Sequence, residues 1–342
     1  MPVKGKPAES SNVVRIKDVA LAAGVSTATV SQVFNHKGEV AKATRARVLA
    51  TGKRLGYTPN PVGRALRTGQ SRVLGVLVSY RDSPVWQETY LPYYREIISD
   101  AAIEAMEHGY SVAAASPGAD DLADAISNLG GVIVVDPVAD DAIVGYCAAR
   151  GIPLVADGGL FGVRGEKQMV VRGDVARFVG EILELSAAQH RARHGRELTD
   201  IGLFTGSVID RYTADSEEAF VAWCDARRVT PHVFALKPGE TVKGKALQIL
   251  KENDLDAAYC LNESYSGALI GAADALGIDI PGQLILSSAV TAPHSRQDPR
   301  INYVESAEAE GPGRRAVRLL VDFLETGTAK DSVEGFRLRP AR

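Results

Sequence analysis

The sequence has few cysteines, and none of them is spaced like a metal ligand. Cys147, Cys224 and Cys260 are the three among 342 residues, and no two form a Cys-x-x-Cys motif. An odd number of scattered cysteines also does not make the even framework of a disulfide-rich secreted protein. This pattern predicts a protein of the reducing cytoplasm.

Signals for export and for membrane insertion are also missing. Residues 1–12, MPVKGKPAESSN, are polar, contain proline and are not followed by an apolar run, so we expect no signal peptide. No apolar stretch has the length needed to span a bilayer. We predict a disordered basic tail over residues 1–12 and no membrane partner.

No arrangement typical of catalysis or of cofactor binding stands out. Gly158, Gly159 and Gly162 lack the spacing of a phosphate-binding loop. His190 and His194 have a spacing that can hold a metal, but they lie in the basic segment HRARHGRE, which we expect to be exposed and which offers no third ligand. We therefore predict no enzyme, no cofactor and no metal.

Charge is distributed unevenly along the chain. Residues 1–72 hold 13 Lys and Arg against three acidic residues, a net charge of +10, so the remainder of this −3 chain carries −13. A basic module on an acidic body attracts a polyanion at one end and repels it elsewhere. The N-terminal part is therefore the candidate nucleic-acid binder.

This basic part has the pattern of a helix-turn-helix module. A first helix is predicted over about residues 16–23, ending at Gly24. Ser26 is suited to cap a second helix, because its hydroxyl can accept an otherwise unpaired backbone N–H. Apolar residues of both helices recur at helical spacing and form an inward face: Val19, Ala20, Ala23, Val30, Val33 and Phe34.

The opposite face of the second helix is small and polar. Thr27, Ala28, Ser31, Gln32 and Asn35 share it. A helix that enters the major groove needs low bulk for close approach, and it needs donors and acceptors that can reach base edges. We expect Thr27, Ala28 and Gln32 to face bases, with Gln32 able to pair with adenine through two hydrogen bonds.

A third helix is predicted over about residues 44–55, burying Val48, Leu49 and Leu55 and containing an unfavourable Gly52. The alternative for these three helices is a structural module whose polar face is merely solvated. The basic charge and the segment that follows favour DNA binding. The remaining predicted DNA contacts are Arg15, Lys17, Ser26, Thr29, Ser31, Asn35, Tyr57 and Asn60.

Residues 60–71 form a predicted hinge. Asn60 is a good N-cap and Pro61 suits the first helical position, but a helix of about residues 61–67 is too short to persist alone in water. We therefore hypothesise that it folds only when two copies pack together on DNA. Arg64 and Arg67 flank Leu66, which is either a DNA contact or a linker residue that packs on the core.

Residues 15–69 resemble the headpiece of the lactose-repressor (LacI/GalR) family of bacterial regulators. The motifs that carry the resemblance are RIKDVALAAGVS, TATVSQVFN, LGYTPN and NPVGRAL. The resemblance implies that Leu66 enters the minor groove at the operator centre, where an apolar wedge unstacks a base step. Residues 72–342 are more loosely similar to the family's periplasmic-binding-protein-like core.

In this body, strands and helices alternate, which is typical of parallel α/β sheets. Strand segments are predicted at residues 73–80, 111–116, 131–136, 152–157, 201–206, 232–236, 257–262 and 284–290. Helices are predicted near residues 94–108, 215–227, 241–253 and 264–277. As in the resembled fold, a last helix at about 313–326 and a strand near 333–339 are expected to cross between lobes.

The predicted fold is an all-α headpiece with a hinge helix, followed by two doubly wound parallel-sheet lobes. The domains are the DNA-binding module at 13–59, the hinge and linker at 60–71, and an effector-binding and dimerisation core at 72–342. We assign about 72–172 and 300–327 to the first lobe, and about 173–299 and 328–342 to the second.

Ligands of such lobes bind beyond the carboxyl ends of the strands. The candidate effector-binding residues are Ser79, Tyr80, Tyr93, Tyr94, Ser116, Asp136, Asp157, Arg211, Asn262 and Ser288. The aromatic-rich segment from Tyr80 to Tyr94, with Trp86, is a candidate lid. The alternative for each is a polar residue that happens to end a strand, or a packed ring.

Two departures from the common family pattern bear on the effector. Ser216 stands where many members have Arg, and Val290 stands where many have Asp. These are the residues that hold sugar hydroxyls in many members, so a sugar effector is less supported. The alternatives are an aromatic or less hydroxylated metabolite, a protein partner, or no effector at all.

The sequence therefore predicts a transcriptional regulator, with repression implied by the resemblance. It binds a pseudo-palindromic operator as a homodimer, under control of a small-molecule effector in the interlobe cleft. The alternative is a solute-binding protein or an enzyme on the same two lobes, which would not need the headpiece.

Overall fold

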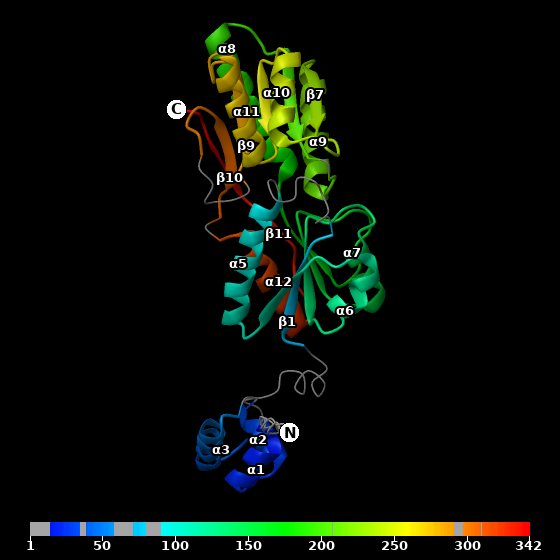
Figure 1. Ribbon diagram of the computed structural model, residues 1–342, viewed down its shortest axis with the longest axis vertical. Helices are drawn as coiled ribbons and strands as arrows, with labels where there is room; N and C mark the ends of the chain where they lie inside the picture. The colour runs from blue at the N-terminus through cyan, green and yellow to red at the C-terminus, as the bar shows by residue number, and fades with distance from the viewer. Residues whose placement is uncertain are drawn as a thin grey trace, which may run out of the picture. The chain divides into compact units, whose positions relative to one another are not determined.

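The computed structural model describes residues 14–34, 39–57, 71–79, 90–206, 208–290, 297–308 and 310–342. The chain divides into two compact units between Ser71 and Arg72 (Figure 1). Each unit has a hydrophobic core of its own. Among the described helices, none combines the length and the apolar character needed to cross a membrane.

The first unit is a three-helix module, here called the headpiece. Its helices are α1 (Ile16–Ala23), α2 (Thr27–Phe34) and α3 (Lys42–Leu55). Gly24 ends α1 in the left-handed region at φ 62°. The Ser26 side-chain oxygen accepts a hydrogen bond from the Thr29 backbone N–H at 3.1 Å. The predicted cap of the second helix is therefore confirmed.

The headpiece core differs from the prediction on the third helix. Val19, Val30, Val33 and Val48 are fully buried, as expected, but Leu49 is 41% exposed. The prediction for Leu49 was wrong because it lies about 100° around the helix from Val48. The residue that packs inward on the next turn is Gly52.

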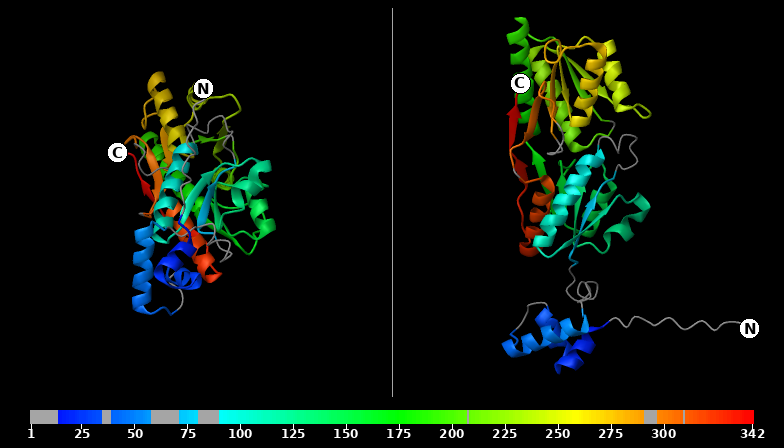
Figure 2. Two further views of the ribbon diagram at one scale, coloured as in Figure 1. Left: turned by 60° about the horizontal axis from the view of Figure 1, so that its bottom comes forward. Right: turned by 60° about the vertical axis from the view of Figure 1, so that its left-hand side comes forward.

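The second unit consists of two α/β lobes. The first lobe has a parallel sheet in the order β11-β5-β4-β3-β1-β2. Its strands are β1 (Val73–Leu77), β2 (Ser111–Ala115), β3 (Gly131–Val135), β4 (Leu154–Asp157), β5 (Gln168–Gly173) and β11 (Ser332–Glu334). α5 (Leu91–Glu107) and α12 (Pro312–Thr326) pack side by side over one face (Figures 1 and 2). α6 (Leu122–Ile126) and α7 (Ala142–Arg150) contribute to the core on the other face.

The second lobe repeats this plan with the sheet order β12-β10-β9-β8-β6-β7. Its strands are β6 (Asp200–Thr205), β7 (Thr230–Ala235), β8 (Ala257–Cys260), β9 (Ile285–Ala289), β10 (Asn302–Ser306) and β12 (Phe336–Arg339). α8 (Val175–His194) packs on α9 (Arg211–Arg227), and α10 (Val242–Glu252) packs on α11 (Glu263–Leu276). Only β12 runs antiparallel to its neighbour, β10. Both sheets have the predicted doubly wound form.

Three segments connect the lobes, and they shift the predicted lobe boundaries. β10 pairs with β9 in the second lobe, so residues 302–306 do not belong to the first lobe as predicted. The predicted strand at 333–339 is two strands, β11 in the first sheet and β12 in the second, separated by Gly335. In Figure 2 this red segment leads from the lobe of α12 to the other lobe. The pairing of the strands, and not their order in the sequence, therefore decides to which lobe residues 300–311 and 328–335 belong.

Several predicted elements of the body also need correction. β5, β10 and the helices α7 and α8 were not predicted as separate elements. β2 was predicted as a buried strand, but most of its residues are exposed because it is the edge strand of its sheet. α9 begins at Arg211, four residues before the predicted start.

Candidate functional site

The headpiece presents one exposed face of α2. Thr27, Ala28 and Gln32 are exposed on it, whereas Val30 and Val33 of the same helix are fully buried. Thr29 and Ser31 are half-buried at its margin. The packing of the valines against α1 and α3 therefore fixes which side of α2 faces outward. This face has the low bulk and the polar tips that contact with base edges requires.

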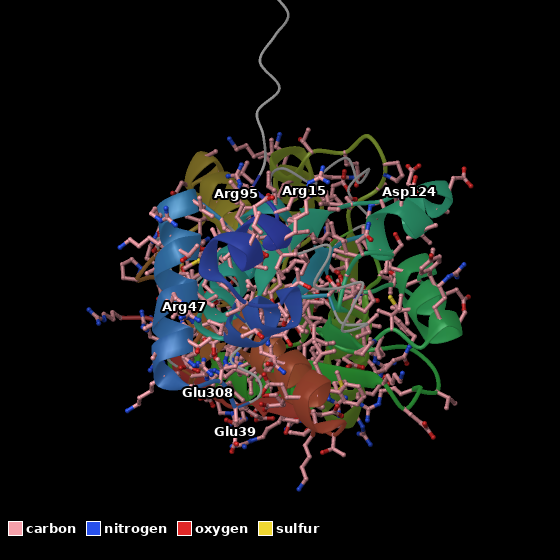
Figure 3. All side chains as sticks on the ribbon, turned by 90° about the horizontal axis from the view of Figure 1, so that it is seen from below. Arg15, Glu39, Arg47, Arg95, Asp124 and Glu308 are labelled. Atoms are coloured by element: carbon pink, nitrogen blue, oxygen red, sulfur yellow. The ribbon has the colours of Figure 1, made fainter. Side chains whose placement is uncertain are left out.

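The headpiece also carries exposed basic side chains on α1, on α3 and just before α1. Arg15 lies at the start of α1 and Arg47 on α3, both exposed (Figure 3). Lys17, Lys53 and Arg54 are exposed as well. Cations on neighbouring helices can contact the phosphates on either side of a groove.

An aromatic pair, Phe34 and Tyr57, packs at the C-terminal end of α2. The ring of Tyr57 meets that of Phe34, the last residue of α2, edge to face at a centroid distance of 5.2 Å. Tyr57, a predicted phosphate contact, therefore also helps to hold α2 in place. The other predicted DNA contacts, Asn35, Asn60, Arg64, Leu66 and Arg67, lie outside the described residues.

The second candidate site is a cavity of about 680 Å³ in the two-lobed unit. Both lobes line it, and the ends of strands supply many of its walls. Asp136 follows β3, Asp157 ends β4, and Asn262 closely follows β8. The volume lies within the range of small-molecule sites, and the position is the one expected for ligands of open α/β sheets.

Two carboxylates in this cavity come from opposite lobes and are almost fully buried. Asp157 belongs to the first lobe and Asp210, which caps α9, to the second; each is 2% exposed. Burial raises the pKa of Asp157 to about 7, against the lowering effect of the hydrogen bond from Tyr93. Burial likewise raises the pKa of Asp210 to about 6, although the backbone N–H of Thr213 donates to it. Both carboxylates can thus accept hydrogen bonds from a ligand, and water does not fully solvate either of them.

Aromatic side chains form much of the remaining wall. Tyr90 and Tyr93 extend from the start of α5, Tyr212 lies in the first turn of α9, and Tyr265 lies on α11. The Tyr93 hydroxyl donates to Asp157 at 2.7 Å, and the Tyr212 hydroxyl donates to the Leu261 carbonyl at 3.1 Å. The rings supply apolar area, while their hydroxyls keep hydrogen-bond partners.

The lobes also contact each other beside the cavity. An isolated antiparallel bridge joins Val138 of the first lobe to Asp210 of the second. The Arg211 guanidinium stacks over Phe161 at 5.4 Å from the ring centroid. Arg211 also comes so close to Gly159 that a Cβ there would lie 2.8 Å from its Cγ. Residues 210–211 of the second lobe therefore contact the first lobe directly, and these contacts would change if the lobes moved apart.

Two family models match this chain. Residues 15–60 match the model described as "Bacterial regulatory proteins, lacI family", and residues 188–340 match "Periplasmic binding protein-like domain". The HTH-type transcriptional repressor CytR of Escherichia coli (strain K12) is 37% identical over 110 residues, which is 32% of this chain and 29% of that protein. The sucrose operon repressor of Pediococcus pentosaceus is 24% identical over 283 residues, 79% of this chain and 80% of that protein.

The chain contains a DNA-binding domain of the lacI family and a periplasmic-binding-protein-like domain.

Solved structures of lacI-family regulators share the fold. The lac repressor dimer bound to operator and the anti-inducer ONPF has a TM-score of 0.72 at 18% identity, covering 96% of this chain and 98% of that one. The transcriptional regulator CelR–cellobiose complex has a TM-score of 0.62 at 22% identity, covering 95% and 98%. The match with CytR spans less than a third of that relative. What this protein binds therefore has to be argued from its own residues.

Four of the predicted effector residues line the cavity. They are Tyr93, Asp136, Asp157 and Asn262. The side-chain oxygen of Asn262 also caps α11, because it accepts hydrogen bonds from the backbone N–H groups of Ser264 and Tyr265. Asp136 has a positive φ of 45°, a strained backbone conformation of the kind found at functional sites.

The other predicted effector residues lie elsewhere. The Tyr94 hydroxyl donates to the Val76 carbonyl at 2.9 Å, so Tyr94 belongs to the core of the first lobe. Ser288 lies within β9 and is fully buried, with its hydroxyl donating to Ala289. Arg211 makes the interlobe contact described above. Ser79 and Ser116 follow β1 and β2 and are not among the cavity-lining residues, and Tyr80 and Trp86 lie outside the described residues.

Tyr90 was predicted only as part of the candidate lid, and the predictions missed several other cavity residues, namely Phe178, Asp210, Tyr212, Tyr265 and Phe336. Most of them lie in or next to the first turn of a helix rather than at the end of a strand. The available signal was the capping pattern, because Asp210 and Asn262 are N-caps of the helices that follow β6 and β8. A cap residue brings the first turn of its helix to the same edge of the sheet.

The two departures from the common lacI-family pattern have structural counterparts. Ser216 is fully buried, and its hydroxyl finds no hydrogen-bond partner among the described residues. Val290 lines the cavity and places an apolar side chain there. Val290 therefore makes the cavity less polar than the common pattern implies, whereas Ser216 is not among the cavity-lining residues.

The histidine pair on α8 is less exposed than predicted. His190 is 1% exposed, and its ring lies 4.5 Å from that of His194. Its nearest carboxylate is Asp256 at 3.7 Å, which already pairs with Arg196. The segment is basic, as predicted, but its first histidine packs into the second lobe.

Proposed function

We propose that this protein is a sequence-specific DNA-binding transcriptional regulator, acting as a repressor from the cytoplasm. The observation that carries the proposal is α2, whose exposed face is small and polar in a basic headpiece of the lacI family. Thr27, Ala28 and Gln32 contact bases, and the exposed cations of the headpiece contact phosphates. Repression is the activity named for CytR and for the sucrose operon repressor.

The protein binds a pseudo-palindromic operator as a homodimer. One helix-turn-helix reads only a few base pairs, whereas a two-fold dimer reads two half-sites about one helical turn apart. The lac repressor is a dimer on its operator in the structure cited above. The hinge at 60–71 folds in the minor groove, where Leu66 is the wedge and Arg64 and Arg67 hold phosphates.

A small molecule in the interlobe cavity controls operator affinity. The cavity is lined by both lobes, so a ligand within it favours one lobe arrangement over another. That arrangement sets the distance between the two hinges of a dimer and so decides whether both can fold on DNA. The carboxylates of the cavity act as ligand acceptors, and we propose no catalytic role for them.

The test begins with selection of DNA by the full-length protein. Random duplexes are selected by the purified chain at low and at moderate salt, and the recovered sequences are read. An inverted repeat enriched at both salt concentrations supports the proposal. A metabolite panel is then screened by thermal shift, because a ligand of the folded state raises the melting temperature. Enriched DNA without an inverted repeat would contradict binding as a dimer. Metabolites that bind but leave operator affinity unchanged would contradict control by an effector.

A further inference from the structure

Among the described residues that line the cavity, nine are acidic and three are basic. Asp157 and Asp210 project from opposite lobes into one space, and each lies close enough to act electrostatically on the other. Their side chains accept hydrogen bonds from uncharged groups, the Tyr93 hydroxyl for Asp157 and the Thr213 backbone N–H for Asp210. Asp136 lines the same cavity. Two carboxylates that face each other across the lobes repel each other once both are ionised.

Of the three arginines that line the cavity, Arg337 and Arg339 pair with a carboxylate other than Asp157 and Asp210, and Arg172 is exposed. Arg337 and Arg339 both bind Glu305, at 2.7 and 2.9 Å. Arg315, outside the wall, pairs with the wall residue Glu334. Arg211, the neighbour of Asp210, pairs with Asp215 and stacks on Phe161. The protein thus supplies cations to Glu305 and Glu334 more directly than to Asp157 and Asp210.

Aromatic rings surround the same space. Tyr90, Tyr93, Tyr212 and Tyr265 line it together with Phe178 and Phe336. The faces of such rings attract organic cations by about 0.5–2 kcal/mol each, depending on desolvation. A neutral polyol would gain hydrogen bonds from the carboxylates, but it would not neutralise them.

We propose that the cavity is selective for an organic cation, whose protonated amine lies between Asp157 and Asp210 and whose apolar part lies against the tyrosine rings. The inference rests on the proposed function only in treating this cavity as the effector site. A positive charge held by one carboxylate from each lobe stabilises the arrangement that brings the lobes together. The same charge that selects the ligand therefore drives the conformational change.

The test compares amines with alcohols of the same skeleton. Benzylamine, tyramine and tryptamine are titrated into the full-length protein, without DNA, beside benzyl alcohol, tyrosol and tryptophol. Binding is followed by thermal shift and calorimetry up to about 10 mM. At least one amine is expected to bind at least about tenfold more tightly than its own alcohol, a ratio that corresponds to about 1.4 kcal/mol.

Variants assign this preference to the carboxylates. Asp157→Asn and Asp210→Asn, singly and together, preserve the side-chain shape and the acceptor for Tyr93 while removing the charge. They should reduce the amine preference to less than about threefold. Asp120→Asn with Asp124→Asn, at exposed positions of the first lobe, is the matched control and should preserve it. If the double variant at the cavity does not fold, the comparison of amines with alcohols on the wild-type protein still tests the proposed preference for a cation.

Three results would overturn the inference: alcohols that bind as tightly as their amines, an amine preference that survives both cavity substitutions, or no saturable binding of any of the three amines. Its fate is separable from that of the proposed function. An amine that binds in this way but never alters operator binding leaves the cation site in place and removes effector control. A neutral metabolite that occupies the cavity and alters operator binding does the opposite.

Discussion

At the scale of single residues, specificity for DNA depends on side chains that the headpiece core turns outward. Gln32 is exposed on α2, one residue before the fully buried Val33. An amide side chain in this position can accept from and donate to one adenine at the same time. Thr27 and Ala28 add contacts of low bulk, so Gln32 is the strongest single candidate for direct reading of a base.

Replacing Gln32 by Ala should therefore relax sequence preference rather than abolish DNA binding. We expect the loss of about 1–3 kcal/mol of discrimination at one symmetric position in each half-site. DNA selected by the variant and by the wild type is compared position by position. Gln248→Ala, at an exposed position on α10, is the control and should change nothing. Identical selected sites for Gln32→Ala and wild type would show that Gln32 does not read a base.

The buried carboxylate of Asp157 makes stability depend on pH. Its pKa is raised by burial from 3.8 to about 7, so the folded protein retains a proton that the unfolded chain loses. The contribution of Asp157 to the free energy of unfolding therefore falls as the pH rises from about 4 to about 7. Asp157→Asn is uncharged throughout this range and removes that contribution. Between pH about 5 and about 7.5 its melting temperature should fall less than that of the wild type.

The exposed substitution Asp124→Asn serves as the control for this comparison. It should follow the wild-type melting curve at both pH values. Parallel behaviour of Asp157→Asn and wild type would mean that Asp157 is ionised at the same pH in the folded and unfolded states. Ligand-free protein is needed, because a bound cation would lower the pKa of the same group.

The sequence identified some of the cavity residues, but it could not show which way each side chain points. Tyr93 and Tyr94 are adjacent on a helix, so their side chains differ by about 100° and only one can face the cavity. The structure turns Tyr93 to Asp157 and Tyr94 to the backbone of β1. Ser288 was misjudged because β9 extends one residue beyond it. Such choices depend on where each helix and strand lies in the packed lobe.

At the scale of elements, the position of α2 depends on a close contact with α3. A Cβ at Gly52 would lie 2.6 Å from the ring of Phe34, so a larger residue there requires this ring or one of the two helices to shift. Helix propensity alone disfavours glycine by about 1 kcal/mol relative to alanine. The residue that looks unfavourable in the sequence is thus favoured by packing.

Gly52→Ala should therefore destabilise the headpiece although alanine favours helices. We expect the loss of about 1–3 kcal/mol, which is typical of overpacking in a well-packed core. Hydrogen exchange of α3 peptides in the full-length protein measures the local opening. Gly180→Ala in α8, where an added Cβ meets nothing within 4 Å, should instead slow exchange in its own helix. Slower exchange of α3 in Gly52→Ala would contradict the packing argument.

Element prediction succeeded where a pattern is local and failed where pairing is distant. The caps at Gly24 and Ser26 fixed α1 and α2, because each signal lies within a few residues of the helix end. β5 and β10 were missed because their apolar stretches, Met169–Val171 and Tyr303–Val304, are short and flanked by polar residues. The division of residues 333–339 into β11 and β12 depends on partners more than 30 residues away in the sequence.

At the scale of the whole molecule, charge separates the two units. Residues 1–72 carry +10 and the rest carries −13, which suits contact of one end with a polyanion. The doubly wound lobes and the division of the chain at residue 72 were within reach of sequence reasoning, because alternation and charge extend over long segments. The residues that line the cavity could be predicted only in part from the sequence, because both lobes contribute them.

The proposed coupling between the cavity and the DNA depends on the hinge, whose residues 60–70 lie outside the described part of the chain. We expect it to become helical only in a dimer on DNA, since one short helix is unstable alone. Gly63→Ala should then tighten operator binding, because it favours the helix by about 1 kcal/mol per chain. Operator titrations of the variant and wild type measure the change. Unchanged or weaker binding would count against folding of the hinge on DNA.

The central claim is that two headpieces of this chain bind a symmetric DNA site together, largely through phosphates and with α2 reading bases. The most direct measurement is the affinity of the full-length protein for a selected inverted repeat, for its single half-site and for a scrambled duplex, each as a function of salt. We predict two chains per inverted repeat, an affinity at least about a thousandfold above that for the scrambled duplex, and steep weakening with salt on all three. Equal, salt-insensitive affinities for the three duplexes would contradict the claim.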